Sequence, residues 1–434
     1  MSLFQKNNFM WVSLINKLRL IIKDRTLRNR IIFVFAALFV FRLFAAIPIP
    51  GVDTAQLQRF FSSNQFLGLL NIFSGGGLSN ISIMMLGVGP YITASIIMQL
   101  LTMMSEKLKA MYHEEGEAGR KKFTMISRYI TVPLAVIQGV GFIILLQRQG
   151  ILPIATPLVF VSTIASVVAG SLLLTWLGEL ISEFGIGNGM SLIIFAGIVA
   201  GLPTALNQVI FTYTPAQIPS YLAFVFVSLI IVAGVVIVTE AERPIPVTYA
   251  KQTRSNGKAQ GGSSTYLPLR INQAGVMPII FALSILLLPQ IVSNLLVTVQ
   301  NDIVQNIVRA FNGFSANLWS YGITYFVLVF LFTYFYTAVT FDPDAISKNL
   351  QRNGAFIPGV RPGEATSKHI ASVLTRITMI GAIFLGAIAV LPIIVQGISG
   401  ITSLTIGGTS LLIAVSVLID LIKKIDAQVS LREY

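Results

Sequence analysis

The chain has 434 residues, of which 54% are hydrophobic and only 11% are charged, and its mean hydropathy is +0.79. So few charged side chains cannot cover the surface of a water-soluble protein of this size, which excludes a soluble globular enzyme or binding domain. The absence of cysteine excludes disulfides and thiolate metal sites, and the two histidines, His113 and His369, fall in different predicted loops. We therefore predict a polytopic membrane protein without a metal centre.

The N-terminal stretch, residues 1–30, alternates lysine and arginine with apolar side chains such as Phe9, Trp11 and Ile15. This pattern predicts a basic amphipathic helix that lies on the inner leaflet of the membrane. It lacks the order of a cleavable signal peptide, because no small-residue cleavage site follows the apolar run that starts at Ile31.

Apolar windows of about 17 to 25 residues, the length that crosses a bilayer as a helix, follow along the rest of the chain. Ten windows are present, at residues 31–47, 79–104, 125–146, 154–176, 190–211, 220–239, 273–296, 319–340, 370–392 and 404–422. Each window predicts one transmembrane helix.

The distribution of basic residues predicts how these helices are oriented. Of the 30 lysine and arginine residues, 26 lie in the N-terminal stretch, in every second connection and in the C-terminal stretch, and Arg42 lies within the first window. The alternate connections hold only Arg59, Arg148 and Arg309. Because basic residues are retained on the cytoplasmic side, both termini are predicted to be cytoplasmic, and the alternation supports the count of ten segments.

The hexapeptide Gly-Val-x-Pro-x-Ile occurs twice, at residues 87–92 and 275–280, each time inside a long apolar run. Glycine and proline there break or bend a membrane helix, and paired breaks in two halves indicate a site at the bilayer centre. A six-residue match can also arise by chance in a chain this rich in Ile, Val and Gly. If each half has five segments, the halves are inverted repeats, and Ile92 and Ile280 both lie near the midplane.

Two amide side chains are predicted to lie at a similar depth. Gln99 comes seven residues after Ile92, and Asn272 comes eight residues before Ile280. At about 1.5 Å per residue, both lie roughly 10 to 12 Å from the isoleucines toward the cytoplasm. They could hydrogen-bond across a seam between the second and seventh segments, or each could lie at the headgroup boundary.

The connections carry two further signals. The apolar stretch 66–73 is too short to span the membrane, so it is either a re-entrant piece or an interfacial helix. On the inner side, the loop 240–272 carries Arg254 and Lys258, and the loop 341–369 carries Arg361. These basic loops could face anionic lipid, or they could bind an acidic protein or RNA phosphates.

Several motifs resemble, in order from about residue 30 to the end, the SecY family of protein-conducting channel subunits. They are IPIPG (47–51), FSGGG (73–77), GVGPYITAS (87–95), GEAGRKK (116–122), GIGNG (185–189), GAFIPGVRPGE (354–364) and GGTSLLI (407–413). The resemblance implies an all-α fold of ten transmembrane helices in two inverted five-helix halves, residues 31–211 and 220–434, around a central hourglass pore. It also implies a channel that translocates unfolded secretory polypeptides and releases membrane segments sideways into the bilayer.

The same resemblance implies roles for individual side chains. The positions that match the family's constriction at the midplane, called the pore ring below, are Val88, Ile92, Met190, Ile194, Ile280 and Ile413. An aliphatic ring dewets a narrow pore and so blocks ions, yet it can part around a passing chain. Met190 departs from the β-branched or other aliphatic residue that is usual in the family, and its unbranched, flexible side chain could loosen the seal.

A plug and a lateral gate are implied as well. Residues 66–81 resemble the plug on the outer side of the ring, with candidate residues Phe66, Leu69, Leu70, Phe73, Gly75 and Gly76. Segments 2 and 3 against segments 7 and 8 resemble the lateral gate, with Gln99 and Asn272 at its inner end. Signal sequences and membrane segments would pass through this gate to the lipid.

Partners follow from the inner loops. Arg361 resembles the arginine on which the ribosome or the SecA motor ATPase depends, and Arg254 and Lys258 lie in the other docking loop. Many relatives have adjacent basic residues after the sixth segment, whereas here Pro244 follows Arg243. The resemblance further implies SecE-like and SecG-like small subunits, a location in the cell (inner) membrane, no cofactor and no catalytic residue, because the partner supplies the energy.

A secondary solute transporter is the rival class, because it also uses inverted repeats and broken helices. Such a transporter keeps ionisable groups near the midplane to bind its coupling ion. The apolar windows contain almost none, since Arg42 can extend outward and Asp420 lies near the inner end of its segment. The composition therefore favours the channel.

Overall fold

We analysed a computed structural model of the chain. It describes residues 23–50, 74, 81–113, 115–148, 150–152, 156–211, 218–249, 252–253, 259–260, 264–296, 301–399 and 402–430. An amphipathic helix is predicted over residues 1–30, and residues 1–22 of it lie outside the described residues.

Each of the ten predicted windows overlaps one helix of 16 residues or more. These are α2 (Arg25–Ala45), α5 (Gly89–Met104), α7 (Gly116–Arg148), α8 (Pro157–Phe184), α9 (Gly189–Phe211), α10 (Ile218–Glu240), α11 (Met277–Leu296), α13 (Leu318–Thr340), α15 (Glu364–Ser399) and α16 (Thr402–Ser430). Shorter helices lie in three connections, namely α6 (Glu106–His113), α12 (Asp302–Ala316) and α14 (Pro343–Arg352).

The surface of the helix bundle is apolar in the way that a bilayer requires. Large side chains that face outward include Phe35, Leu158 and Phe226, which are 69%, 80% and 66% exposed. Within the described residues, four helical stretches are long and apolar enough to cross a membrane by length and composition alone, and further apolar helices such as α5 are shorter. Exposed apolar surface on this scale would not be stable in water, so lipid surrounds the bundle.

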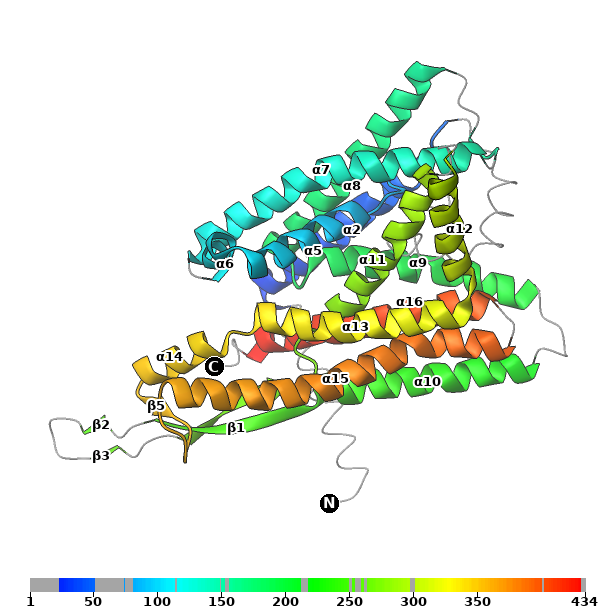
Figure 1. Ribbon diagram of the computed structural model, residues 1–434. Helices are drawn as coiled ribbons and strands as arrows, with labels where there is room; N and C mark the ends of the chain where they lie inside the picture. Colours follow the sequence, from blue (N-terminus) through cyan, green and yellow to red (C-terminus); the bar gives the residue numbers. More distant parts are fainter. Residues whose placement is uncertain are drawn as a thin grey trace.

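The helices form two groups with contacts between them. Figure 1 shows α2, α5, α7 and α8 gathered in one part of the molecule and α10, α13 and α15 side by side in another. Helix α11 packs against α5 and α7 of the first group and against α13 of the second, and α16 packs against α9. The two groups of helices therefore meet along α11, and α16 contacts α10 and α15 as well as α9.

The repeated hexapeptide has the same local structure in both places. Gly87 and Gly275 have φ of 59° and 61°, a left-handed conformation that favours glycine. In each copy the backbone N–H of the final isoleucine donates to the valine carbonyl, from Ile92 to Val88 at 3.0 Å and from Ile280 to Val276 at 3.2 Å.

One prediction about this motif is wrong. Glycine and proline do not break a helix that runs through the apolar window, because α5 begins only at Gly89 and α11 only at Met277. The proline lies in the first turn, where its missing N–H needs no partner. Ile92 and Ile280 therefore lie in the first turn of their helices rather than near the middle.

Helix α8 holds the turn that precedes α5. The hydroxyl of Ser171 donates to the Gly87 carbonyl at 2.9 Å. A Cβ at Gly170 would lie 2.1 Å from the carbonyl oxygen of Ile83, so only glycine allows the turn to approach the helix this closely. The position of Val88, which ends the turn, depends on this contact.

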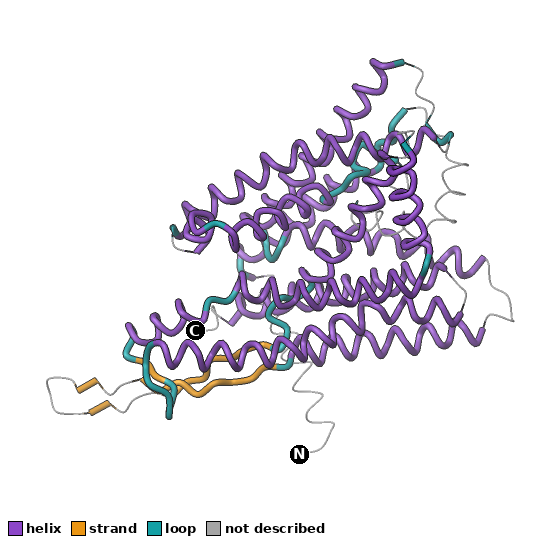
Figure 2. Tube along the Cα trace, in the orientation of Figure 1, coloured by secondary structure: helices purple, strands orange, loops and turns teal. Residues whose placement is uncertain are grey.

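The loop 240–272 contains β-structure, which the all-α prediction did not include. Strand β1 (Glu242–Tyr249) pairs antiparallel with β4 (Ser264–Arg270), and β5 (Ala355–Phe356) completes a sheet of order β4-β1-β5. Figure 2 shows these strands at one end of the helix bundle, and the two-residue strands β2 (Gln252–Thr253) and β3 (Ala259–Gln260) pair farther out.

The sheet joins the two basic loops into one module. Ile245 and Val247 of β1 are buried against Ala355 and Ile357 of the second loop and against Ile370 of α15. The two loops that the sequence predicts as separate docking segments therefore share one apolar core.

Replacing Gly170 with alanine is expected to destabilise the protein, because the new methyl group would overlap the Ile83 carbonyl. Overpacking of this kind costs about 1–3 kcal/mol. Thermal unfolding of the purified protein measures the effect. Gly201→Ala in α9 is the matched control, because nothing lies within 4 Å of a Cβ there. Equal melting temperatures for the two variants would contradict the close approach of the turn to α8.

Candidate functional site

The six residues predicted for the pore ring lie in one buried apolar cluster. Val88 precedes α5 and Ile92 lies on it, Met190 and Ile194 lie on α9, Ile280 on α11 and Ile413 on α16. None is more than 9% exposed. The cluster therefore brings together side chains from four parts of the chain that are far apart in sequence, and these side chains have no polar atoms with which to bind a solute.

Met190 differs from the other five in what its side chain contacts. A Cβ at Gly178 of α8 would lie 2.5 Å from the Met190 sulfur and 2.8 Å from its terminal methyl carbon. The end of this side chain is therefore packed over Gly178 of α8. The unbranched, flexible methionine side chain thus fills the space beside this glycine.

The predicted hydrogen bond between Gln99 and Asn272 does not form. The Gln99 amide nitrogen lies 3.4 Å from the Ser95 hydroxyl on its own helix, and the Asn272 amide donates to the Gly275 carbonyl at 3.1 Å. The side-chain oxygens of Gln99 and Asn272 are both buried without a hydrogen-bond partner. The depth predicted for Asn272 assumed a helical rise, but residues 271–276 form a turn.

The two unpaired oxygens lie on segments that meet. Helix α11 packs against α5 and α7, and Asn272 lies in the turn before α11. A buried acceptor without a donor costs about 1–3 kcal/mol. The packing around each of the two oxygens is therefore less stable than it would be if a donor were present.

An ion pair that the sequence did not predict joins α7 to α8. The guanidinium of Arg128 donates to one carboxylate oxygen of Glu179, which is only 17% exposed. The other carboxylate oxygen of Glu179 is buried without a partner. The one signal in the sequence is that two neighbouring helical segments carry opposite charges. That signal does not reveal which charged residues meet.

The loop around Arg361 is a tight structure that presents the guanidinium outward. Gly359 and Gly363 have φ of 84° and 98°, and the Thr366 hydroxyl donates to the Arg361 carbonyl at 2.8 Å. The Ser347 hydroxyl of α14 donates to the Gly363 carbonyl at 2.6 Å. The backbone is held from both sides, and the exposed Arg361 side chain is available to a partner.

Several predicted site residues lie outside the described part of the chain. They are the plug candidates Phe66, Leu69, Leu70, Phe73, Gly75 and Gly76, and the loop residues Arg254 and Lys258. Ser74, within the predicted plug, is described and fully buried. Among the described residues, no group of three or more His, Asp or Glu side chains could hold a metal ion.

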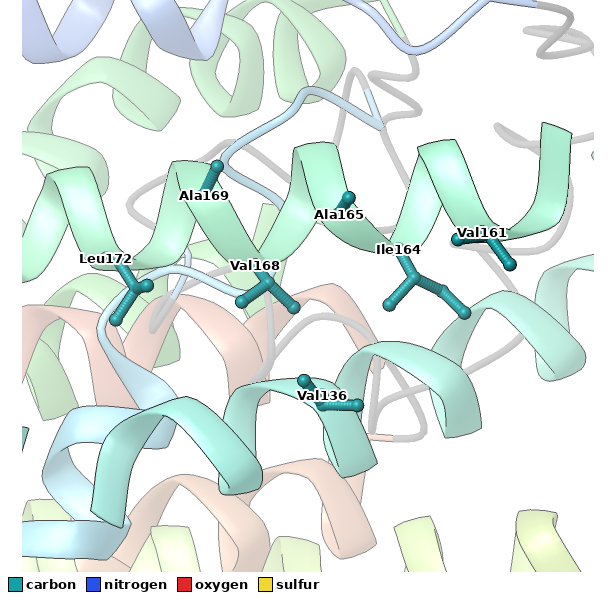
Figure 3. A pocket seen from close by; sticks show the side chains of 7 residues that line it. All are labelled: Val136, Val161, Ile164, Ala165, Val168, Ala169 and Leu172. Atoms are coloured by element: carbon teal, nitrogen blue, oxygen red, sulfur yellow. The ribbon is translucent and has the colours of Figure 1, made fainter. Parts of the chain in front are cut away.

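The helix surface also carries an apolar groove of about 420 Å³ between α7 and α8 (Figure 3). Its lining residues are Val136, Val161, Ile164, Ala165, Val168, Ala169 and Leu172. The lining has no charged or hydrogen-bonding side chain that could orient a polar solute, so the groove suits hydrocarbon rather than a soluble substrate.

Comparison with known proteins identifies the family of this chain. The family model described as SecY matches residues 82–422. A protein translocase subunit SecY from Staphylococcus aureus is 41% identical over 422 residues, which cover 95% of this chain and 96% of that protein.

Two solved structures share the fold. The structure of a protein-conducting channel has a TM-score of 0.63 at 20% identity, covering 94% of this chain and 93% of that one. Sec61 in the canine ribosome-channel complex from the endoplasmic reticulum has a TM-score of 0.59 at 19% identity, with the same coverage of both chains. The match over nearly the whole length, together with the motifs in the sequence, shows that this chain belongs to the SecY family.

Proposed function

We propose that this chain is the channel of a protein translocase, which moves unfolded secretory polypeptides across the membrane and releases apolar segments sideways into the bilayer. The observation that carries the proposal is the convergence of Val88, Ile280 and Ile413 from separate helices in one buried apolar cluster, together with the other ring positions. Membership of the SecY family supports it. The chain is a channel subunit rather than an enzyme.

The pore ring closes the idle channel in this proposal. Aliphatic side chains exclude water from a narrow constriction, so ions cannot pass. They form no directional hydrogen bonds, and the ring can therefore part around many different polypeptide sequences without holding any of them. Met190 contributes less to the seal than the five branched residues, because its end packs over Gly178 of α8.

The lateral gate lies between α5 and α7 on one side and α11 and α13 on the other. A signal helix that inserts between α5 and α11 would separate them and expose the unpaired oxygens of Gln99 and Asn272. Water or the polar groups of the passing chain could then donate to these oxygens. The cost of leaving them unpaired is relieved on opening, which lowers the energy required to open the gate.

The plug, residues 66–81, would cover the ring from the outer side. Phe66, Leu69, Leu70 and Phe73 supply apolar surface for this contact, and Gly75 and Gly76 allow the segment to bend. The buried Ser74 and Ile81 support a position inside the bundle.

We place the β-sheet module and both termini on the cytoplasmic side of the inner membrane, because basic residues concentrate on that side. Arg361, Arg254 and Lys258 would then contact the ribosome or a SecA motor, and that partner supplies the energy. The likeness to a Sec61 channel in a ribosome-channel complex supports the ribosome as a partner. SecE-like and SecG-like subunits would complete the complex within the membrane.

Replacing Ile194 with asparagine is expected to make the idle channel leak ions, because an amide in the ring hydrates the constriction. The current through single channels in planar bilayers measures the leak. Leu192→Asn, on the same helix and equally buried, is the control that leaves the ring unchanged. An equal leak, or none, in both variants would contradict the ring.

Paired cysteines at Gln99 and Asn272 are expected to crosslink across the gate seam and to block translocation of a secretory precursor. The chain contains no cysteine, so no background substitutions are needed. Oxidation followed by reduction, with transport assayed in vesicles at each stage, tests the prediction. The single-cysteine variants serve as controls. If neither this pair nor pairs one turn away crosslink under any condition, the gate is assigned to the wrong helices.

Charge reversal at Arg361 is expected to reduce motor-driven or ribosome-driven translocation by roughly tenfold or more, because a charge-assisted hydrogen bond is worth about 1.5–3 kcal/mol. Membrane insertion of the variant should be normal. Arg352→Glu, an exposed arginine at the end of α14 in the same module, is the matched control. Equal transport by wild type and Arg361→Glu would remove Arg361 from the docking surface.

A further inference from the structure

Helix α12 joins α11 to α13 and lies crosswise at the end of the bundle that is opposite the β-sheet (Figure 1). Its first turn is capped by Asn301, whose side chain accepts from the Ile303 N–H at 3.0 Å. A single residue, Asn317, forms the corner to α13. The N–H of Asn317 donates to the carbonyls of Gly313 and Phe314, and its side chain accepts from Trp319.

This corner fixes the direction of α12. One residue ends the first helix and caps the next, so the chain turns abruptly and the two helices cannot merge into one longer helix. Helix α13 is apolar and long enough to cross the membrane. Because α12 lies crosswise to α13 at the start of that helix, α12 lies along the membrane surface.

The exposed surface of α12 has two sides of opposite character. Ile303, Ile307 and Phe311, spaced four residues apart, form an apolar stripe and are 71%, 43% and 36% exposed. Arg309 comes two residues after Ile307 and so lies about 200° further round the helix. It is exposed too, as is Asn306.

A third sector of α12 faces the protein. Val308 is only 3% exposed, and α12 packs against both α11 and α13. The apolar stripe is therefore not the face that holds the helix on the bundle. Val308 faces the protein instead, and the described residues leave the stripe uncovered.

The geometry points to a lipid surface as the occupant of the stripe. We propose that α12 is an interfacial helix whose side chains Ile303, Ile307 and Phe311 insert between the acyl chains of the leaflet opposite the β-sheet, while Arg309 and Asn306 lie among the headgroups. An interface between hydrocarbon and water matches a helix whose exposed surface is divided into an apolar sector and a polar sector. A protein partner would require only one of them.

Contact of α12 with lipid would also affect the proposed gate, because of where α12 lies. Helix α12 follows α11 in the chain and packs against it, and α11 is the helix that the proposed gate moves. A helix held in the leaflet anchors the outer end of α11. The inference goes beyond the proposed channel function and would hold even if the gate lay elsewhere.

Site-directed labelling tests the proposal directly, because the natural chain has no cysteine. Single variants Ile307→Cys and Phe311→Cys on the stripe, with Arg309→Cys as the matched control one half-turn away, are labelled with an environment-sensitive fluorophore. The full complex with its small subunits is then placed in phospholipid vesicles. Quenching is measured with iodide in the water and with lipids that carry a nitroxide on the acyl chain.

Labels at Ile307→Cys and Phe311→Cys are expected to be quenched several-fold more by the acyl-chain nitroxide than by iodide, and the label at Arg309→Cys should show the reverse order. Two results would overturn the proposal. Strong iodide quenching on the stripe would place it in water, and protection from both quenchers would show that a protein subunit covers it. Using two stripe positions keeps the test valid if one variant fails to fold.

Discussion

Aliphatic side chains from four helices meet in one buried cluster, and much of the fold serves to bring them there. The turn before α5 is held by the Gly170 and Ser171 contacts of α8, which place Val88. A turn of the same geometry precedes α11 and places Ile280. Contacts between aliphatic side chains exclude water without directional bonds, so a cluster of this kind is tight at rest and costs little to rearrange.

The contacts between the two groups of helices differ in strength from the contacts within the β-sheet module. In the helix bundle, Gln99 of α5 and Asn272 in the turn before α11 each bury an amide oxygen that has no donor. In the module, by contrast, a continuous antiparallel ladder and a shared apolar core join two distant loops. The β-sheet module is thus held by paired backbone groups as well as by apolar packing, whereas the amide oxygens of Gln99 and Asn272 have no such pairing.

Helix α15 connects these two regions. It begins three residues after Arg361, at Glu364, and continues into the membrane. A Cβ at Gly381 on this helix would lie 2.7 Å from the carbonyl oxygen of Ile271, the residue before Asn272. The Arg361 loop therefore leads directly into α15, and the turn before α11 lies against the same helix.

The sequence by itself determined the membrane class, the positions of the apolar segments and the family. These features depend on composition, segment length and local motifs, because each membrane helix satisfies its own backbone hydrogen bonds. Only the tertiary structure decided that Asn272 bonds to its own turn, that Met190 packs over Gly178, that Arg128 pairs with Glu179 and that the basic loops form a sheet. Each of these contacts is decided by the backbone conformation at the site or by its neighbours in space, which the linear order of residues does not specify.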